Sequence, residues 1–236
     1  MEKPVLFEIK NNIATITLNR PEKRNALNQD LLVHFYNYLE DAKKNQDVNV
    51  IIITGSGTAF CAGLDLSAIY TDNLIDPRGD GKDFPDIIDA CSKPIIGAVN
   101  GAAITGGFEI ALNCDFLIAS ENAVFADTHA KVGIHPGWGM TQLLQQAVGK
   151  RMAKQLSFTC KYISAQEALN LGLVNKVVPN EELMPVSLQI ASEINSFNQP
   201  MIRTIKKLID YKESTVFENV FKHERQGFKK FMGGKG

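Results

Sequence analysis

The stretch KPIIGAVNGAAITGGFE, residues 93–109, is the most informative segment of this chain. A β-branched apolar run ends in a glycine pair, and Glu109 follows just inside a predicted helix. Glycine at a strand-to-helix junction leaves backbone N–H groups open to a ligand, and the helix dipole there favours negative charge. Glu109 comes three residues after Gly106, so its side chain can face whatever those N–H groups bind. An N–H donor beside a carboxylate can stabilise an enolate or oxyanion and move protons around it.

A second stretch, TGSGTAFCAGLDL at residues 54–66, has the same order of features. It follows the apolar run of residues 50–53, and its glycine-bearing turn leads to an exposed amide that opens a helix. A glycine pair before a helix is common in α/β proteins, and a glutamate in a first turn is usually a solvated partner of the dipole. The second stretch adds weight to the catalytic interpretation of Gly106 and Glu109.

Length and composition indicate a globular protein. Its 236 residues suit one compact domain with a small appendage, and 44% hydrophobic against 22% charged residues is ordinary for such a domain. A formal net charge of −1 gives no basic surface for nucleic acid, and no apolar run approaches the ~20 residues of a membrane span. Met1 leads directly into a strand-like segment without a cleavable leader, which predicts a cytoplasmic protein.

The cysteines and histidines do not form a metal motif. The four cysteines are scattered without C-x-x-C spacing, which predicts reduced and mostly buried thiols. Asp127, His129 and His135 could be considered as metal ligands, but their spacing is too loose to indicate a metal site. We therefore predict no metal.

Periodicity and turn residues predict an α/β fold. Residues 6–9 and 13–18 are predicted strands joined by a turn at Asn11-Asn12, and Asn28 is the predicted N-cap of a helix that ends at Ala42. Further strands are predicted over residues 48–54, 94–99, 115–119, 123–126 and 174–178, and helices over residues 107–114 and from Gly139 onward.

In the remaining segments, capping residues, glycines and prolines mark where helices and loops begin and end. Residues 164–167 form a capping box, and Gly172 ends the helix that follows it. Prolines and glycines interrupt residues 69–86, which we predict to be a mobile flap, and residues 127–138 are a predicted loop. The chain is helical from Asn180 onward with a break at Pro200.

Together these segments closely resemble the crotonase (enoyl-CoA hydratase/isomerase) family. The matching motifs are LNRP (18–21), NALN (25–28), FCAGLDL (60–66), residues 93–115, PGWGMTQ (136–142), ISAQEA (163–168) and GLV (172–174). The similarity runs in register over residues 7–179 and more weakly to the C-terminus. The resemblance implies a crotonase-like spiral of ββα units over residues 1–179 that contains the active site. It also implies a C-terminal helical trimerisation region over residues 180–236, and CoA thioester substrates.

The resemblance also implies catalytic roles. The family's oxyanion-hole amides fall on Leu64 and Gly106, where they would polarise the thioester carbonyl, and its first glutamate falls on Glu109. The second glutamate of hydratases falls on His129, in the gapless segment Asp127-Thr128-His129-Ala130. This is the main departure from the family pattern.

Three functions stay open because of His129. A histidine transfers protons near neutral pH, and Asp127 would orient it if the segment is extended, so His129 is either a functional replacement or a packed loop histidine. The first function is hydration of 2-enoyl-CoA by Glu109 and His129. The second is an enoyl-CoA isomerase that uses Glu109 alone, and the third is a catalytically weak acyl-CoA binder.

The resemblance further implies substrate contacts at Lys23, Arg24, Ala26, Ala62, Asp65, Leu66, Gly107 and Trp138. Lys23 and Arg24 would contact the CoA phosphates, although cationic side chains in loops are more often solvated. Trp138 would either line the acyl pocket or pack in the core. Gly137 stands where dienoyl-CoA isomerases, 3-hydroxyisobutyryl-CoA hydrolases and aryl-CoA dehalogenases have an aspartate, which argues against these three chemistries. CoA is part of the substrate, so no separate cofactor is expected. A homotrimer or dimer of trimers is expected from the family, while chain length and pathway stay undetermined.

Overall fold

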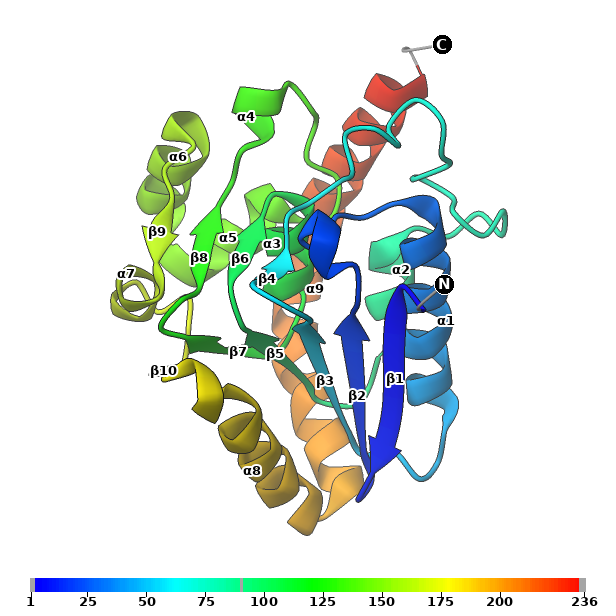
Figure 1. Cartoon of the computed structure of the whole chain (residues 1–236), viewed down its shortest axis with the longest axis vertical. Coiled ribbons are helices and arrows are strands. Elements are labelled where there is room, and N and C mark those ends of the chain that lie inside the picture. The colour runs from blue at the N-terminus through cyan, green and yellow to red at the C-terminus, as the bar shows by residue number, and fades with distance from the viewer. Residues whose placement is uncertain (1–2, 90, 234–236) are drawn as a thin grey trace.

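The structure, a computed structural model, describes residues 3–89 and 91–233. Among these residues, a six-stranded sheet has the order β1 (Val5–Lys10), β2 (Ile13–Leu18), β3 (Val50–Gly55), β5 (Ile95–Val99), β7 (Phe116–Ser120), β10 (Lys176–Val178). β1 is antiparallel to β2, and the other neighbours are parallel. A four-stranded sheet has the order β4 (Ala59–Cys61), β6 (Ala102–Ile104), β8 (Val124–Ala126), β9 (Ile163–Ser164), and the two sheets are seen together in Figure 1.

Helices connect and cover these sheets (Figure 1). They are α1 (Gln29–Lys44), α2 (Phe84–Ile88), α3 (Gly106–Leu112), α4 (His129–Val132), α5 (Met140–Val148), α6 (Lys150–Thr159), α7 (Ala165–Asn170), α8 (Leu183–Ser196) and α9 (Gln199–Gly233), with short 3₁₀ turns at Pro21–Lys23 and Asn180–Glu182. Within the described chain, no helix combines the length and apolar character needed to cross a membrane.

The predicted spiral of ββα units is confirmed. A strand of the larger sheet leads to a short strand of the smaller sheet and then to a helix in β3–β4–α2, in β5–β6–α3 and in β7–β8–α4. Because the strands within each sheet run parallel through these units, the turns that leave their carboxyl ends gather on one side of the molecule. These turns include the two glycine-bearing stretches singled out in the sequence.

The continuous apolar run of β3 is explained by burial on both faces of the larger sheet. Ile51 and Ile53 belong to the main core, which includes Phe35 of α1. Val50 and Ile52 point the other way and pack in a second cluster with residues of α8. Side chains alternate along a strand, so a strand covered on both faces must be apolar at every position.

Local sequence signals correctly predicted a hairpin turn and two helix caps. Asn11 and Asn12 both adopt positive φ, 51° and 62°, as the two-residue hairpin turn requires. The Asn28 side chain accepts a hydrogen bond from the Leu31 N–H at 3.0 Å, and the helix it caps runs to Lys44, beyond the predicted end at Ala42. The capping box at Ser164 and Glu167 is also present.

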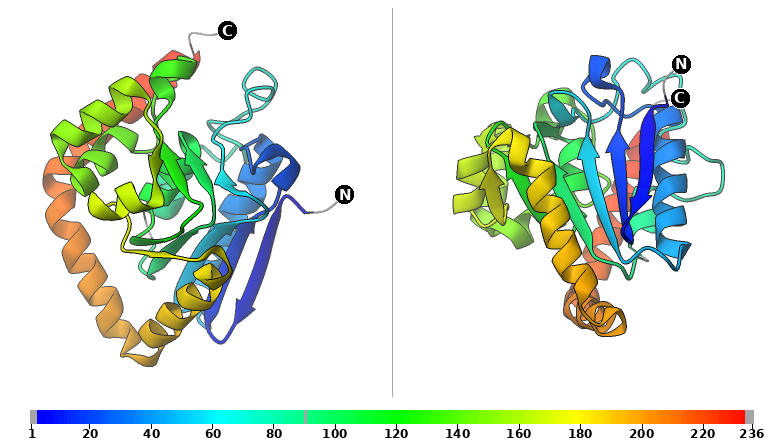
Figure 2. Two further views of the ribbon diagram at one scale, coloured as in Figure 1. Left: turned by 60° about the vertical axis from the view of Figure 1, so that its left-hand side comes forward. Right: turned by 60° about the horizontal axis from the view of Figure 1, so that its bottom comes forward.

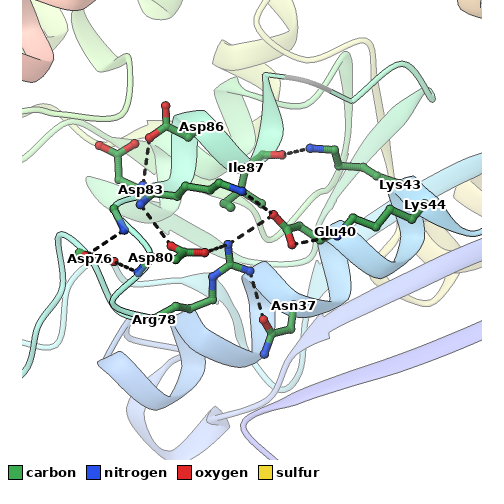
Figure 3. Close-up of polar contacts among 12 residues, drawn as sticks. Asn37, Glu40, Lys43, Lys44, Asp76, Arg78, Asp80, Asp83, Asp86 and Ile87 are labelled. Atoms are coloured by element: carbon green, nitrogen blue, oxygen red, sulfur yellow. Dashed lines mark hydrogen bonds and ion pairs between the residues drawn. The ribbon is translucent and has the colours of Figure 1, made fainter.

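The segment 69–86 is more ordered in the structure than the predicted mobile flap. It ends in α2, whose Phe84 is fully buried, so the prediction of a loop up to residue 86 is wrong there. Arg78 donates to Asn37 at 3.1 Å and to Glu40 at 3.3 Å, which anchors the segment to α1 (Figure 3). The hydrogen bond from Arg78 lowers the pKa of Glu40 to about 2.

The C-terminal helices pack against this chain's own core. The break between α8 and α9 falls just before Gln199, and Pro200 occupies the first turn of α9, where its missing N–H removes no helical hydrogen bond. α9 then runs along the length of the molecule and ends beside the segment that precedes α2 (Figures 1 and 2). There, Arg225 pairs with Asp83 at 2.5 Å and with Asp86 at 2.6 Å. Burial raises the pKa of Asp83 to about 6, while the Arg225 charge opposes that rise.

A buried asparagine joins the N-terminal loop to the first glycine turn. Asn25 Oδ1 accepts from the Arg20 N–H at 2.8 Å, and Nδ2 lies within hydrogen-bond distance of the carbonyls of Ser56, Ala59 and Phe60, at 2.9, 2.8 and 3.2 Å. The side chain is fully buried, and its φ of 55° is unfavourable for most residues.

We expect Asn25→Ala to lower the free energy of unfolding by about 2–4 kcal/mol, because it leaves buried N–H and C=O groups without partners. Urea denaturation would measure the change. Asn122→Ala, at an exposed position, is the matched control and should stay within about 0.5 kcal/mol of wild type. A similarly small change for Asn25→Ala would contradict the proposed role of this side chain.

Candidate active site

A cavity with about 620 Å³ of empty space, its mouth included, collects most of the residues singled out in the sequence. Its lining contains Ala62, Leu64, Leu66, Gly106, Glu109, His129 and Trp138. The other predicted residues, Lys23, Arg24, Ala26, Asp65 and Gly107, do not line it. The two glycine turns, the β8–α4 junction and the loop before α5 therefore form one site.

The backbones of the two glycine turns touch at this cavity. A Cβ atom on Gly63 would lie 3.4 Å from the Gly106 nitrogen, and Gly63 has a φ of 89° that favours glycine. Leu27 bridges to Leu64: the Leu27 N–H donates to the Gly63 carbonyl at 2.8 Å, and the Asp65 N–H donates to the Leu27 carbonyl at 2.9 Å.

This pairing leaves the Leu64 N–H out of the bridge. Neither it nor the Gly106 N–H donates to any group of the described residues. Both residues line the cavity, so the two N–H groups can receive the oxygen atom of a ligand.

Thr105 precedes Gly106 in an unusual backbone conformation. Its φ of 52° and ψ of −111° are rare for a β-branched residue and cost about 1–3 kcal/mol. The Thr105 N–H donates to the Ala126 carbonyl at 2.9 Å, and its hydroxyl lies 2.5 Å from that of Thr128. These contacts hold the turn in this conformation.

Glu109 is buried in the first turn of α3, with one carboxylate oxygen held by the loop before α5. Oε1 accepts from the N–H groups of Gly137, Trp138 and Met140 at 3.3, 2.9 and 3.2 Å. The other oxygen, Oε2, lies 3.8 Å from His129 Nε2. The carboxylate is thereby fixed on one side and faces the imidazole on the other.

His129 is oriented by Asp127, as the sequence predicted, but through a different backbone. The segment is not extended, because α4 begins at His129. Asp127 Oδ1 accepts from the His129 N–H at 3.1 Å and lies 2.7 Å from Nδ1. A carboxylate can only accept, so Nδ1 carries the proton in this contact and Nε2 is left facing Glu109.

Burial alone would raise the pKa of Asp127, but the hydrogen bonds from His129 outweigh it and hold the pKa below its usual range. Asp127 is thus an ionised carboxylate that can stabilise a positive charge on the imidazole.

An apolar wall adjoins these polar groups. Trp138 is buried, and its ring lies near Gly106 and tilts against Phe84 with ring centroids 5.3 Å apart. Phe228 of α9 is 5% exposed and lines the same cavity. A Cβ on Gly137 would come within 2.5 Å of the Phe228 ring, so this ring occupies the space of any larger residue at position 137.

Phe228, Thr105 and Thr128 line the site but were missed in the sequence. Phe228 lies in a Lys-rich helical segment far from the motifs, and nothing local indicates that it reaches the cavity. The two threonines stood inside the quoted segments but carry no chemistry recognisable from spacing alone.

The remaining predicted contacts lie around the cavity. Asp65 accepts from Ser67 at 2.6 Å and from Arg20 at 3.1 Å, and these contacts lower its pKa against the effect of burial. Its carboxylate therefore shapes the turn next to Leu64. Gly107 packs on the Cys61 carbonyl, where a Cβ would approach to 2.1 Å.

Lys23 and Arg24 are exposed, and Ala26 is half-buried. Their segment is joined to the first glycine turn, because the Ala62 N–H donates to the Arg24 carbonyl at 3.0 Å. Across the described residues, no three His, Cys, Asp or Glu side chains gather in a way that could hold a metal ion.

Comparisons with known proteins point to one family. The sequence profile of the enoyl-CoA hydratase/isomerase family matches residues 8–235. A short-chain-enoyl-CoA hydratase of Clostridium acetobutylicum is 43% identical over 86% of this chain and 79% of its own length. A probable peroxisomal enoyl-CoA hydratase 1 of Arabidopsis thaliana is 41% identical over 84% and 75%, respectively. The crystal structure of an enoyl-CoA hydratase from Mycobacterium avium superposes with a TM-score of 0.88 at 40% identity, covering 98% of both chains.

The Asp127 contact predicts a specific pH dependence of stability. Its native pKa is lowered, so the carboxylate contributes stability above its unfolded pKa of about 3.9, and this contribution is lost as the pH falls through the native pKa. We expect Asp127→Asn to be less stable than wild type at pH 7 by about 1–3 kcal/mol, with a difference that shrinks below about pH 4.

Urea denaturation from pH 3 to pH 7 would measure this difference. Asp41→Asn, at an exposed position, is the control for removing a carboxylate. An equal difference between wild type and Asp127→Asn at both ends of the range would contradict the assignment.

Proposed function

The chain belongs to the enoyl-CoA hydratase/isomerase family, and we propose that it hydrates 2-enoyl-CoA thioesters in the cavity that contains Glu109 and His129. The observation that carries this proposal is that two N–H donors and a pair of proton-transferring side chains lie in the same cavity. The N–H groups of Leu64 and Gly106 open into the same cavity as the Glu109–His129 pair, whose nearest atoms lie 3.8 Å apart. The hydratase relatives support the same reaction.

In the proposed reaction, the thioester carbonyl oxygen binds the N–H groups of Leu64 and Gly106. The water oxygen bonds to C3, the electron pair of the C2–C3 double bond moves toward the carbonyl oxygen, and an enolate forms. The two N–H groups stabilise its negative charge, and loss of one such donor costs about 3–4 kcal/mol of barrier in comparable sites. The Glu109–His129 pair takes one proton from the water and returns one to C2, so it ends in its starting state.

His129 would replace a carboxylate in this pair. Asp127 holds the imidazole from the Nδ1 side, so Nε2 can accept a proton while the nearby carboxylate stabilises the imidazolium. The protein groups thus supply both the proton acceptor and the counter-charge. No separate cofactor is expected, because CoA enters as part of the substrate.

We expect Glu109→Gln to lower kcat for crotonyl-CoA hydration by about 10²–10⁴-fold with little change in KM, because the amide cannot transfer a proton. The loss of the conjugated-enoyl absorbance would follow the reaction. Glu121→Gln, at an exposed position, is the matched control and should leave kcat unchanged. Unchanged turnover by Glu109→Gln would refute its catalytic role.

Two variants of His129 complete this test. A large drop for His129→Ala would assign proton transfer to the imidazole, whereas faster hydration by His129→Glu would indicate that the second acid–base role had been lost. A 3-enoyl-CoA distinguishes the alternatives: a gain of conjugated absorbance, without hydration of crotonyl-CoA, would favour the isomerase. Acyl-CoA binding without either reaction would favour the binder.

We propose short-chain substrates because of the apolar wall. A carbonyl bound at Leu64 and Gly106 leaves C2 and C3 near Glu109, whose Oε1 is bound by the Gly137 N–H at 3.3 Å. Carbons beyond C4 would therefore meet Gly137 and the Phe228 ring packed on it. The short-chain name of the Clostridium relative supports the same substrate class.

We expect Phe228→Ala to raise the ratio of kcat/KM for a ten-carbon over a four-carbon 2-enoyl-CoA by about tenfold, because the cavity lengthens. Phe158→Ala removes an exposed phenylalanine of α6 and is the matched control, with no expected change in the ratio. An unchanged ratio for Phe228→Ala would show that the chain passes elsewhere.

The assembly and location stay proposals. A homotrimer or dimer of trimers is supported by exposed apolar side chains along α9, namely Met201, Ile205, Leu208 and Ile209. Lys23 and Arg24 stay candidates for the CoA phosphates. A cytoplasmic location and the lack of a nucleic-acid partner remain predictions, and the organelle named for the Arabidopsis relative belongs to that protein.

A further inference from the structure

The hydroxyl pair of Thr105 and Thr128 connects the two halves of the site. The two oxygen atoms lie 2.5 Å apart, and both side chains are buried while lining the cavity. Thr105 belongs to the turn between β6 and α3, and Thr128 to the junction of β8 and α4. Each threonine immediately precedes a residue of the proposed mechanism, Gly106 in one case and His129 in the other.

The backbone on the Thr105 side depends on outside support. A β-branched residue with a φ of 52° and a ψ of −111° lies outside its favoured regions, and such a conformation persists only where the surroundings impose it. The Thr105 N–H binds the Ala126 carbonyl, and its own carbonyl accepts from the Glu109 N–H, each at 2.9 Å. The direction of the Gly106 N–H follows from these torsions, because the peptide unit that bears it is planar.

The backbone on the Thr128 side sets the position of His129. The Thr128 carbonyl accepts from the N–H groups of Lys131 and Val132, both at 3.0 Å, so Thr128 is the N-cap residue of α4. With Asp127 holding the imidazole on one side, the Thr128 hydroxyl fixes the start of this helix against the Thr105 turn.

We propose that the Thr105–Thr128 hydroxyl pair is a positioning unit that sets the Gly106 N–H and the His129 imidazole relative to each other. The group that polarises the thioester carbonyl and the group that transfers the proton then face the same substrate. This inference rests on the proposed function, and neither threonine needs to touch the reacting atoms. Both act through the residue that follows them.

The test uses variants that replace the hydroxyl by a methyl group, remove only the methyl group, or remove the whole side chain. Thr128→Val and Thr105→Val keep a β-branched side chain without the hydroxyl, whereas Thr128→Ser keeps the hydroxyl. Thr105→Gly removes the hydroxyl and tolerates the positive φ, so it folds without the strain of the native turn. Thr159→Val is the control, because the Thr159 hydroxyl binds a carbonyl of its own helix, that of Gln155, at 2.7 Å.

Two readouts separate positioning from general damage. A butanoyl-CoA probe labelled with ¹³C at its thioester carbonyl shows a downfield NMR shift when N–H groups polarise that carbonyl, and the same titration gives its Kd. Crotonyl-CoA hydration gives kcat. We expect Thr128→Val to lose about half of this carbonyl shift and about 10–100-fold in kcat, with Kd changed by less than about threefold. Thr128→Ser should stay within about threefold of wild type in kcat.

The double variant Thr105→Val with Thr128→Val should be no worse than the poorer single variant, because the two hydroxyls act as one unit. Thr105→Gly should also lose the shift. A wild-type shift and kcat in Thr128→Val, or additive losses in the double variant, would overturn the proposal. Wild-type protein that binds the probe with a full shift but does not hydrate crotonyl-CoA would refute the proposed function alone, since the shift still tests the hydroxyl pair.

Discussion

The site depends on the close approach of two backbone turns, at Gly63 and Gly106. A single Cβ on Gly63 would come within 2.9 Å of the Ile104 carbonyl, so the approach exists only because that position is glycine. The parallel pairing of β4 with β6 and the bridge between Leu27 and Leu64 bring the turns together. Everything else in the cavity is arranged around the two N–H groups that result, including Glu109 and the wall that begins at Trp138.

In the mechanism we propose, the Glu109–His129 pair that transfers protons differs in character from two carboxylates. Two carboxylates at short distance repel each other when both are ionised, and one of them tends to keep a proton. A carboxylate and an imidazole attract once a proton has been taken up, and Asp127 adds a second negative charge behind the ring. The line Asp127–His129–Glu109 can therefore hold a positive charge between two negative ones, which suits a group that must accept a proton during turnover and release it afterwards.

Sequence reasoning succeeded where the signal is local and failed where it depends on distant parts of the chain. Asn11 and Asn12 identify a hairpin turn and Asn28 a helix cap, because each depends on neighbouring residues, whereas the spiral was expected only from the resemblance to the family. α2 was missed because its stability comes from burial of Phe84 against aromatic rings elsewhere and from the Arg225 ion pairs. Phe228 and the Thr105–Thr128 pair could not be predicted as site residues for the same reason, since only tertiary contacts bring them to the cavity.

The ion pairs of Arg225 also bear on biosynthesis. The glycine turns, Glu109 and His129 all precede α9 in the chain and are translated before it, whereas Phe228, which forms the wall, lies on α9. Since domains begin to fold as they leave the ribosome, the core can assemble around an open, apolar hollow before α9 is complete. Docking of Arg225 onto Asp83 and Asp86 then closes that hollow. The nascent chain thus exposes this apolar surface until α9 has emerged and docked.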